Sequence, residues 1–201
     1  TGFNPLEAYW VILNGIFSRP KYVSYVIIYS TPLIITGLSV AFALRTGLFN
    51  IGAEGQFIMG ALAAAAAGYY LKLPMVLHVF AAVGLAVIVA GVWGGLAGWF
   101  KARFGVNEVI STIMLNWTAL YISNWAITIE SFGRQGTGKT YAIQPTARID
   151  ILGQWKRTPE GIASLREHPM LWDNLKSPVN LGFIFALLLA ALVWYILNKT
   201  T

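Results

Sequence analysis

The chain has 201 residues, of which 57% are hydrophobic and only 11% are charged. A soluble domain carries about 25% charged residues, so this composition excludes an ordinary soluble domain and indicates a protein that lies in a lipid bilayer. The net charge of +6 is spread over the loops without forming a basic stripe, which favours attraction to lipid surfaces over binding of nucleic acid.

A short amphipathic helix is expected first, over residues 4–17. Asn4 can cap it, Pro5 suits its first position, and Glu7 stands where a capping box needs an acidic residue. Apolar residues then recur at helical spacing: Leu6, Tyr9, Trp10, Leu13, Ile16 and Phe17. We interpret residues 1–22 as a lead-in whose helix lies on the membrane surface, with an ordinary loop helix as the alternative.

Five apolar segments follow, each long enough to cross a bilayer, which requires about 20 residues. They are residues 23–44, 50–70, 75–100, 109–129 and 180–197. The third carries the small-residue pairs Gly91–Gly95 and Gly94–Gly98, a spacing that lets two helices approach closely. The sequence therefore predicts an all-α, polytopic integral membrane helix bundle, with about five transmembrane helices and one short interfacial helix in this chain.

Polar residues stand at the mouths of two of these spans. Residues 48–57 place a carboxylate, an amide pair and two glycines at the start of the second span. Residues 107–116 begin the fourth span with a row of polar side chains on one helix face. A carboxylate in hydrocarbon costs on the order of 2.5–3.5 kcal/mol, so such groups face a bundle interior or a polar path. Our candidates for lining or shaping that path are Asn50, Glu54, Gln56, Asn107, Glu108, Thr112 and Asn116.

Simpler roles remain open for these residues. Thr112 and Asn116 are equally explained by hydrogen bonds between helices, worth roughly 0.6 kcal/mol each. Glu54 stands in the first helical turn, where the helix dipole favours a negative charge. Glu54 and Glu108 can also lie at the membrane–water interface, where water reaches them. If Glu54 and Glu108 carry protons instead, the protein is an ion-coupled secondary transporter.

Residues 130–179 form a polar insert, and connections of this length are usually functional or flexible. Within it, residues 133–140 match the phosphate-binding pattern G-x-x-x-x-G-K-[ST]. That mechanism needs a strand before the loop and a helix directly after it, whereas here a membrane helix precedes the loop and Pro145 follows it. We interpret the match as chance; a membrane-anchored ATP-binding protein that uses Lys139 is the alternative.

The sequence offers no metal site, cofactor site or catalytic nucleophile. It contains no cysteine, which excludes disulfides and thiolate ligands. Its two histidines, His78 and His168, are far apart, and neither has a carboxylate at metal-ligand spacing.

Residues 32–38 and 49–56, followed by 105–116, resemble the permease subunit of bacterial ABC importers. The branch they resemble is the one for nucleosides and simple sugars, which is related to the ribose and branched-chain amino acid permeases. The resemblance implies a transporter subunit without ATPase activity, working by alternating access in the bacterial inner membrane. It also implies three protein partners: a cytoplasmic ABC ATPase, a second permease subunit and an extracytoplasmic solute-binding lipoprotein that delivers a small polar solute.

The resemblance also implies a topology. Counting positive charges would place the basic 130–179 insert in the cytoplasm. The family layout instead places the loops after Arg45 and Lys101 inside, and it adds a helix before residue 1 and several after residue 201. We therefore expect four parts in the chain: an interfacial lead-in (1–22), four transmembrane helices (23–129), an extracytoplasmic insert (130–179), and a fifth helix with a truncated cytoplasmic end (180–201).

Overall fold

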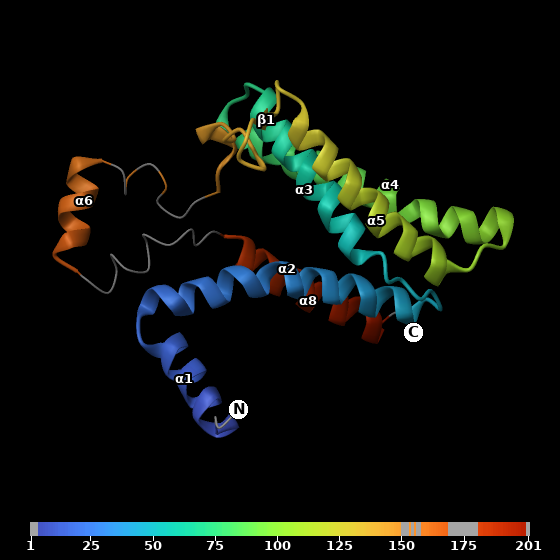
Figure 1. The fold of residues 1–201 in the computed structure, drawn as a ribbon, viewed down its shortest axis with the longest axis horizontal. Helices are drawn as coiled ribbons and strands as arrows, with labels where there is room; N and C mark the ends of the chain where they lie inside the picture. Colours follow the sequence, from blue (N-terminus) through green and yellow to red (C-terminus); the bar gives the residue numbers. More distant parts are fainter. Residues whose placement is uncertain (1–3, 150–152, 154, 156–157, 169–180, 200–201) are drawn as a thin grey trace. The chain divides into compact units, whose positions relative to one another are not determined.

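The computed structural model describes residues 4–149, 153, 155, 158–168 and 181–199. Parts of the predicted lead-in (residues 1–3) and insert (150–152, 154, 156–157, 169–180) lie outside them, as do residues 200–201. In the described part of the chain, the regular secondary structure is helical apart from one short β-hairpin (Figure 1). The prediction of an all-α protein is therefore confirmed.

The chain divides into two units, each described separately. The first comprises residues 1–35 and 149–195, and the second residues 36–148 and 196–201. The helices of the first unit are α1 (Pro5–Phe17), most of α2 (Pro20–Arg45), α6 (Pro159–Arg166) and most of α8 (Gly182–Lys199). The second contains α3 (Ala53–Tyr70), α4 (Met75–Phe104), α5 (Glu108–Thr128), β1 (Gly133–Arg134), β2 (Lys139–Thr140) and the 3₁₀ turn η1 (Pro145–Ala147).

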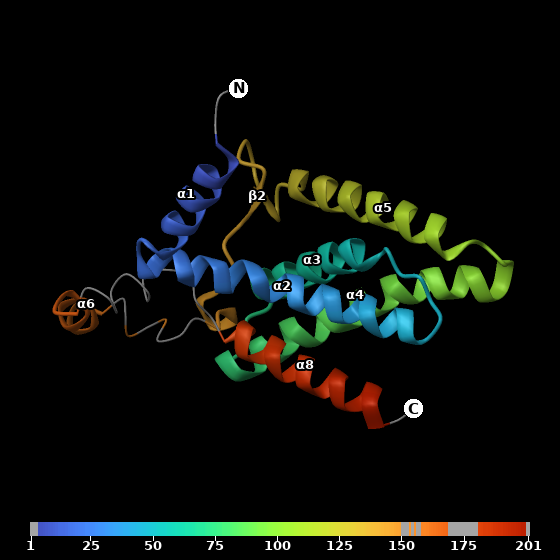
Figure 2. The same cartoon turned by 90° about the horizontal axis from the view of Figure 1, so that it is seen from below.

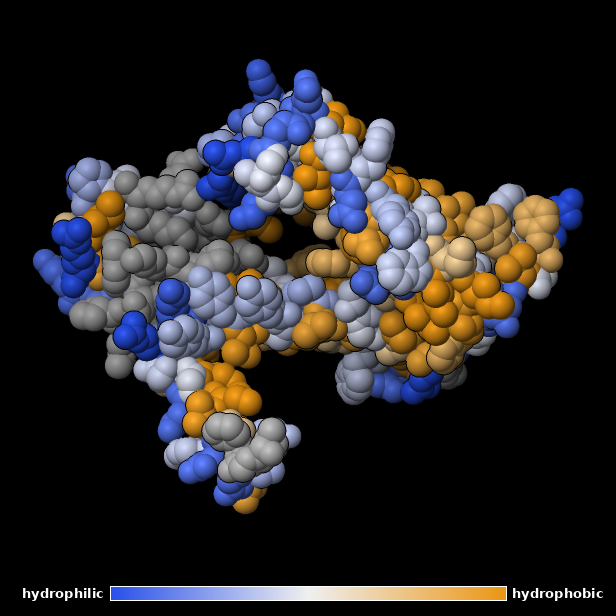
Figure 3. All heavy atoms as spheres, in the orientation of Figure 1, coloured by the Kyte–Doolittle hydropathy of each residue, from blue (hydrophilic) through white to orange (hydrophobic). Residues whose placement is uncertain are grey.

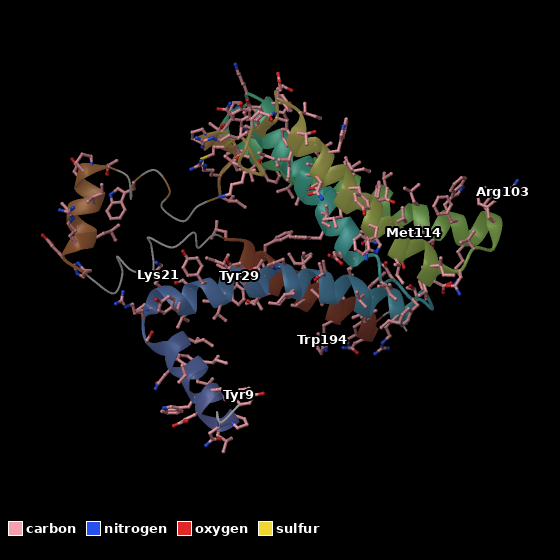
Figure 4. All side chains as sticks on the ribbon, in the orientation of Figure 1. Tyr9, Lys21, Tyr29, Arg103, Met114 and Trp194 are labelled. Atoms are coloured by element: carbon pink, nitrogen blue, oxygen red, sulfur yellow. The ribbon has the colours of Figure 1, made fainter. Side chains whose placement is uncertain are left out.

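The first helix begins where the sequence predicts. The side chain of Asn4 caps α1 by accepting a hydrogen bond from the backbone N–H of Leu6 at 3.1 Å, and Pro5 occupies the first helical position. None of the helix's residues is buried, and Tyr9 projects from it (Figure 4). This leaves a broad apolar surface on α1, so its place on a membrane surface stays a prediction.

Three helices of the described residues are long and apolar enough to cross a membrane, namely α2, α4 and α8. The remaining two predicted spans do form helices, α3 with 18 residues and α5 with 21. At a rise of 1.5 Å per residue these are about 27 and 32 Å long, close to the thickness of the hydrocarbon core. Their polar and small side chains make them less apolar, so the predicted count of five spans is not confirmed.

Helix α3 packs against both α4 and α5, which also contact one another (Figure 2). Small residues permit the contact with α4: a Cβ on Gly60 would lie 3.3 Å from both the Ala86 carbonyl oxygen and the Ala90 Cβ. Gly94 continues that row of α4, and the side chain of Gln56 lies against it.

The small-residue pairs predicted on α4 contribute less to packing than expected. A Cβ added to Gly91, Gly95 or Gly98 would meet no atom within 4 Å among the described residues. Residues four apart form one row of a helix, so α3 covers the row at Ala86, Ala90 and Gly94. Gly91 and Gly95 lie in the next row, and Gly98 continues the covered row but has no described atom of another element within 4 Å of an added Cβ.

The beginning of the predicted insert folds back onto the helix ends. Residues 131–148, which we call the clasp segment, contain the β1–β2 hairpin and η1. Hydrophilic residues gather around this hairpin, whereas hydrophobic residues cover much of α4 and α5 (Figure 3). Arg103 marks the opposite end of α4 (Figure 4). The α3–α5 unit therefore has two polar ends and an apolar middle.

Candidate functional site: the entry to helix α3

The connection from α2 to α3 is not helical over residues 46–52, which we call the entry segment. Helix α2 ends at Arg45, and Gly47 then turns the chain with a φ of +78°, a conformation that favours glycine. Residues 48–51 follow without regular structure. The sequence predicted that this span begins at residue 50, whereas α3 begins at Ala53. Residues 50–52 therefore belong to the entry segment, and the predicted boundary is wrong by three residues.

The entry segment runs beside the first turns of α5. A Cβ on Gly52 would lie 3.1 Å from the Cβ of Thr112, and Ile51 is hydrogen-bonded to Asn116. Asn116 stands eight residues into α5, about 12 Å along its axis. Helix α3 therefore begins two turns along α5. Non-helical backbone at such a depth in a membrane protein is tolerated only where it is buried in protein or lines a watery cavity.

Asn116 satisfies the backbone groups that the start of α3 would otherwise leave unpaired. Its Oδ1 accepts a hydrogen bond from the N–H of Gly55 at 2.8 Å, and its Nδ2 donates to the carbonyl oxygen of Ile51 at 3.0 Å. The first N–H groups of any helix lack partners within the helix. Asn50 contributes a further local bond, because its Oδ1 accepts from the N–H of Gly52 at 2.8 Å.

Close approach of α3 to α5 requires glycine at position 55. A Cβ there would lie 2.8 Å from Asn116 Oδ1, 3.1 Å from Asn116 Cα and 3.2 Å from the carbonyl oxygen of Leu115. Two of these three atoms belong to the backbone of α5, so the helices would have to separate. Thr112 is buried against this junction, and its hydroxyl group donates to the carbonyl oxygen of Glu108 at 2.7 Å.

Glu54 lies at the edge of a pocket on α3 and α5 with a volume of about 240 Å³. The pocket, which we call the α3–α5 pocket, is lined by Glu54, Ile113, Asn116, Trp117 and Leu120. Among the described residues, no cationic group forms a salt bridge with Glu54. Glu54 is exposed, so its carboxylate is open to water or to a polar ligand.

Glu108 has a different environment. It begins α5, just before the predicted span of residues 109–129, and Lys101 Nζ lies 2.7 Å from its Oε1. The hydrogen bond from Lys101 lowers the pKa of Glu108, and the backbone N–H groups of Glu108 itself and of Phe49 act in the same direction. Glu108 is thus paired at the base of the bundle. Asn107 beside it caps α5, its Oδ1 accepting from the N–H of Val109 at 2.9 Å.

The structure thus divides the seven predicted path residues. Asn50, Glu54, Thr112 and Asn116 meet at the start of α3. Gln56 instead lies against α4, and Asn107 and Glu108 lie at the base of α5. Sequence reasoning missed Trp117, which lines the α3–α5 pocket one residue beyond Asn116. Its position next to a polar helix face was the available signal.

A second polar cluster, at the other end of the unit, fastens the clasp segment. His78 is fully buried; its Nδ1 lies 2.8 Å from Thr146 Oγ1 and its Nε2 lies 3.2 Å from the carbonyl oxygen of Ala67. A carbonyl only accepts, so Nε2 carries a proton, and in the neutral ring Nδ1 accepts from the Thr146 hydroxyl. Gln144 adds a backbone bond to the carbonyl oxygen of Gly68 at 2.8 Å.

Aromatic stacking supports the same attachment. The ring of Tyr69 stacks on Tyr141 with centroids 5.5 Å apart, and Tyr70 stacks on Phe132 at 5.8 Å. Both pairs join the end of α3 to the clasp segment. His78, which the sequence left without a role, is therefore a structural contact of this end.

The phosphate-binding pattern of residues 133–140 folds as a hairpin. Gly133 pairs with Thr140 and Arg134 with Lys139, while Gly136 and Gly138 form the turn with positive φ angles. No helix directly follows Lys139 in this stretch of the described chain, where β2 leads into an irregular segment and η1. The backbone N–H groups therefore lack the arrangement that cradles a phosphate, in agreement with a chance match.

Comparison with known proteins gives the chain a family. Residues 22–201 match the family described as branched-chain amino acid transport system / permease component. The guanosine ABC transporter permease protein NupP of Bacillus subtilis (strain 168) is 38% identical over 202 residues, covering all of this chain and 53% of that protein. The nucleoside ABC transporter permease protein NupB of Lactococcus lactis subsp. cremoris (strain MG1363) is 29% identical over 203 residues, with coverage of 100% and 52%.

A third relative carries a sugar in its name. The glucose ABC transporter permease protein TsgB13 of Haloferax volcanii is 35% identical over 125 residues, which are 62% of this chain and 33% of that protein. No solved structure gives a significant match. The chain spans about half the length of the two nucleoside permeases. The resemblance seen in the motifs is confirmed over most of the chain, which belongs to the family of branched-chain amino acid transport system permease components.

Proposed function

We propose that this chain is part of the membrane-spanning permease subunit of an ATP-driven importer that moves a nucleoside across the bacterial inner membrane. The observation that carries the proposal is the similarity over the whole chain to a guanosine permease, at 38% identity. The match to a glucose permease covers less of the chain, so a simple sugar is the second candidate solute.

The mechanism that we propose is alternating access around the start of α3. A segment of irregular backbone beside a polar helix face is the arrangement that transporters use where solutes bind. Asn50, Glu54, Thr112 and Asn116 would line this path, because they meet at the entry segment. Gln56, Asn107 and Glu108 would shape it from the contact with α4 and from the base of α5.

We further propose that α3 and α5 cross the membrane together with α2, α4 and α8. Their lengths match the bilayer, and α5 packs its polar face onto α3 rather than presenting all of it to lipid. The ends that carry Arg45, Lys101 and Arg103 would be cytoplasmic, with the clasp segment and the rest of residues 130–179 outside. α1 would lie on the membrane surface.

The importer would include three further proteins: an ABC ATPase on the cytoplasmic side, a second permease subunit and a solute-binding lipoprotein outside. ATP hydrolysis would take place in the ATPase subunit. The hairpin fold of residues 133–140 supports this assignment, since it leaves this chain without a phosphate-binding loop at that place.

Uptake in proteoliposomes tests the proposal. The complete permease is reconstituted with its ATPase and second permease subunits, and entry of labelled guanosine is measured with the binding protein added outside. We expect uptake that requires ATP and all subunits. Uptake driven by a proton gradient in the absence of the ATPase would contradict the proposal and indicate a secondary transporter that uses Glu54 or Glu108.

A further inference from the structure

The α3–α5 pocket combines three kinds of polar or aromatic side chain. Glu54 brings a carboxylate, Asn116 an amide and Trp117 an indole ring, while Ile113 and Leu120 complete the lining. Its volume of about 240 Å³ lies below the roughly 300–1,000 Å³ of complete small-molecule sites. The pocket therefore has room for part of a ligand, with the rest lying against other surfaces.

The carboxylate of Glu54 sets the charge that this pocket accepts. It has no salt-bridge partner among the residues that the structure describes, in contrast to Glu108, which is held by Lys101. An ionised carboxylate only accepts hydrogen bonds, so its ligand must offer donors. Adjacent hydroxyl groups, as on a ribose ring, are such donors, whereas a phosphate or carboxylate group would be repelled.

The neighbouring side chains extend this preference. Asn116 uses one donor and one acceptor of its amide on the backbone of the entry segment, which leaves a second N–H and further acceptor capacity. Trp117 is 56% exposed, and an indole ring offers a flat face on which a heterocyclic base can stack. The apolar side chains of Ile113 and Leu120 suit the flat face of such a base rather than its polar edges.

We propose that the α3–α5 pocket is a half-site for an uncharged nucleoside, in which Glu54 accepts hydrogen bonds from the ribose hydroxyl groups and Trp117 stacks on the base. The inference rests on the proposed function and deepens it, because it assigns the two parts of the solute to named side chains. It also predicts a selectivity: the 5′-phosphate of the same nucleoside is excluded by the charge of Glu54.

Cysteine protection tests this half-site in the assembled importer. The chain has no cysteine, so after replacement of any in the rest of the permease, Leu120→Cys places one thiol in the pocket lining. Maleimide labelling is followed in proteoliposomes with guanosine, with guanosine 5′-phosphate, or with neither. At guanosine equal to twice its Kd, labelling slows about threefold, by the factor 1 + [L]/Kd. Guanosine 5′-phosphate leaves the rate unchanged.

Two variants and one control complete the experiment. In the Leu120→Cys background, Trp117→Ala abolishes protection by guanosine, whereas Trp117→Tyr, which keeps a flat ring, retains it. Thr137→Cys, in the turn of the β1–β2 hairpin, replaces an exposed side chain outside the pocket and outside the proposed spans, so guanosine does not slow its labelling. Ile113→Cys repeats the measurement from another wall of the pocket if Leu120→Cys does not assemble.

The outcomes separate the two proposals. If guanosine protects neither pocket cysteine while the same vesicles take up guanosine with ATP, the half-site is wrong and the proposed function stands. If guanosine 5′-phosphate protects as well as guanosine, the role of Glu54 is wrong. If the wild-type importer takes up neither guanosine nor any other nucleoside, the proposed function fails and the half-site fails with it.

Discussion

Asn116→Ala removes the side chain that joins the start of α3 to α5. Two backbone groups lose their partners, the N–H of Gly55 and the carbonyl oxygen of Ile51. Leaving a buried polar group unpaired costs about 1–3 kcal/mol, while single hydrogen bonds between membrane helices average about 0.6 and reach about 1.7. Because two bonds are lost and water can reach this half-buried junction, we expect the free energy of unfolding to fall by about 1–3 kcal/mol.

The free energy of unfolding of the complete permease is measured by titration with sodium dodecyl sulfate in mixed micelles. Asn124→Ala is the matched control, because Asn124 is an exposed asparagine on the same helix. A surface substitution of this kind changes stability by less than about 0.5 kcal/mol. If Asn116→Ala is no more destabilising than Asn124→Ala, the two hydrogen bonds of the Asn116 side chain do not hold the entry segment against α5, and our interpretation of this junction is wrong.

Three further predictions concern the glycine at the junction, the clasp segment and the hairpin. Gly55→Ala drives a methyl group onto the backbone of α5 and lowers the thermal unfolding temperature in detergent, whereas Gly15→Ala on α1, where a Cβ meets nothing within 4 Å, does not lower it. Thr146→Val leaves the buried Nδ1 of its histidine partner unpaired, so amide hydrogen exchange speeds up across the clasp segment and not in α5. Lys139→Ala leaves the ATP hydrolysis rate of the assembled importer unchanged, because its hairpin lacks the backbone arrangement that cradles a phosphate; a large fall in that rate would revive the phosphate-loop interpretation.

Local sequence signals predicted the helices well. Asn4 and Pro5 mark the start of α1, and the apolar segments coincide with helices to within a few residues at most ends. The start of α3 was placed three residues too early because the local sequence of residues 50–52 contains no clear helix boundary. Whether such residues are helical depends on the Asn116 amide, which lies more than 60 positions away in sequence.

The candidate site was predicted in part for the same reason. Polar residue type and helical spacing brought out Glu54, Thr112 and Asn116, which do meet at the entry to α3. Those signals did not separate them from Glu108, whose partner Lys101 belongs to another helix. The sequence did not single out Trp117 from the other tryptophans, of which the chain has eight in all. Only the packing of α3 on α5 places it in a pocket.

The proposed alternating-access mechanism requires the entry segment to line a watery route whose exposure changes during transport. Ile51→Cys reports on this route directly, because the side chain is apolar and the residue's own backbone carbonyl oxygen keeps its hydrogen bond from Asn116. The measurement is the rate of modification by a membrane-impermeant thiol reagent, in the assembled importer without nucleotide and after trapping with ATP and vanadate. We expect rapid modification in one state and a rate at least several times slower in the other. A cysteine that stays unreactive in both states, like one facing lipid, would contradict this mechanism.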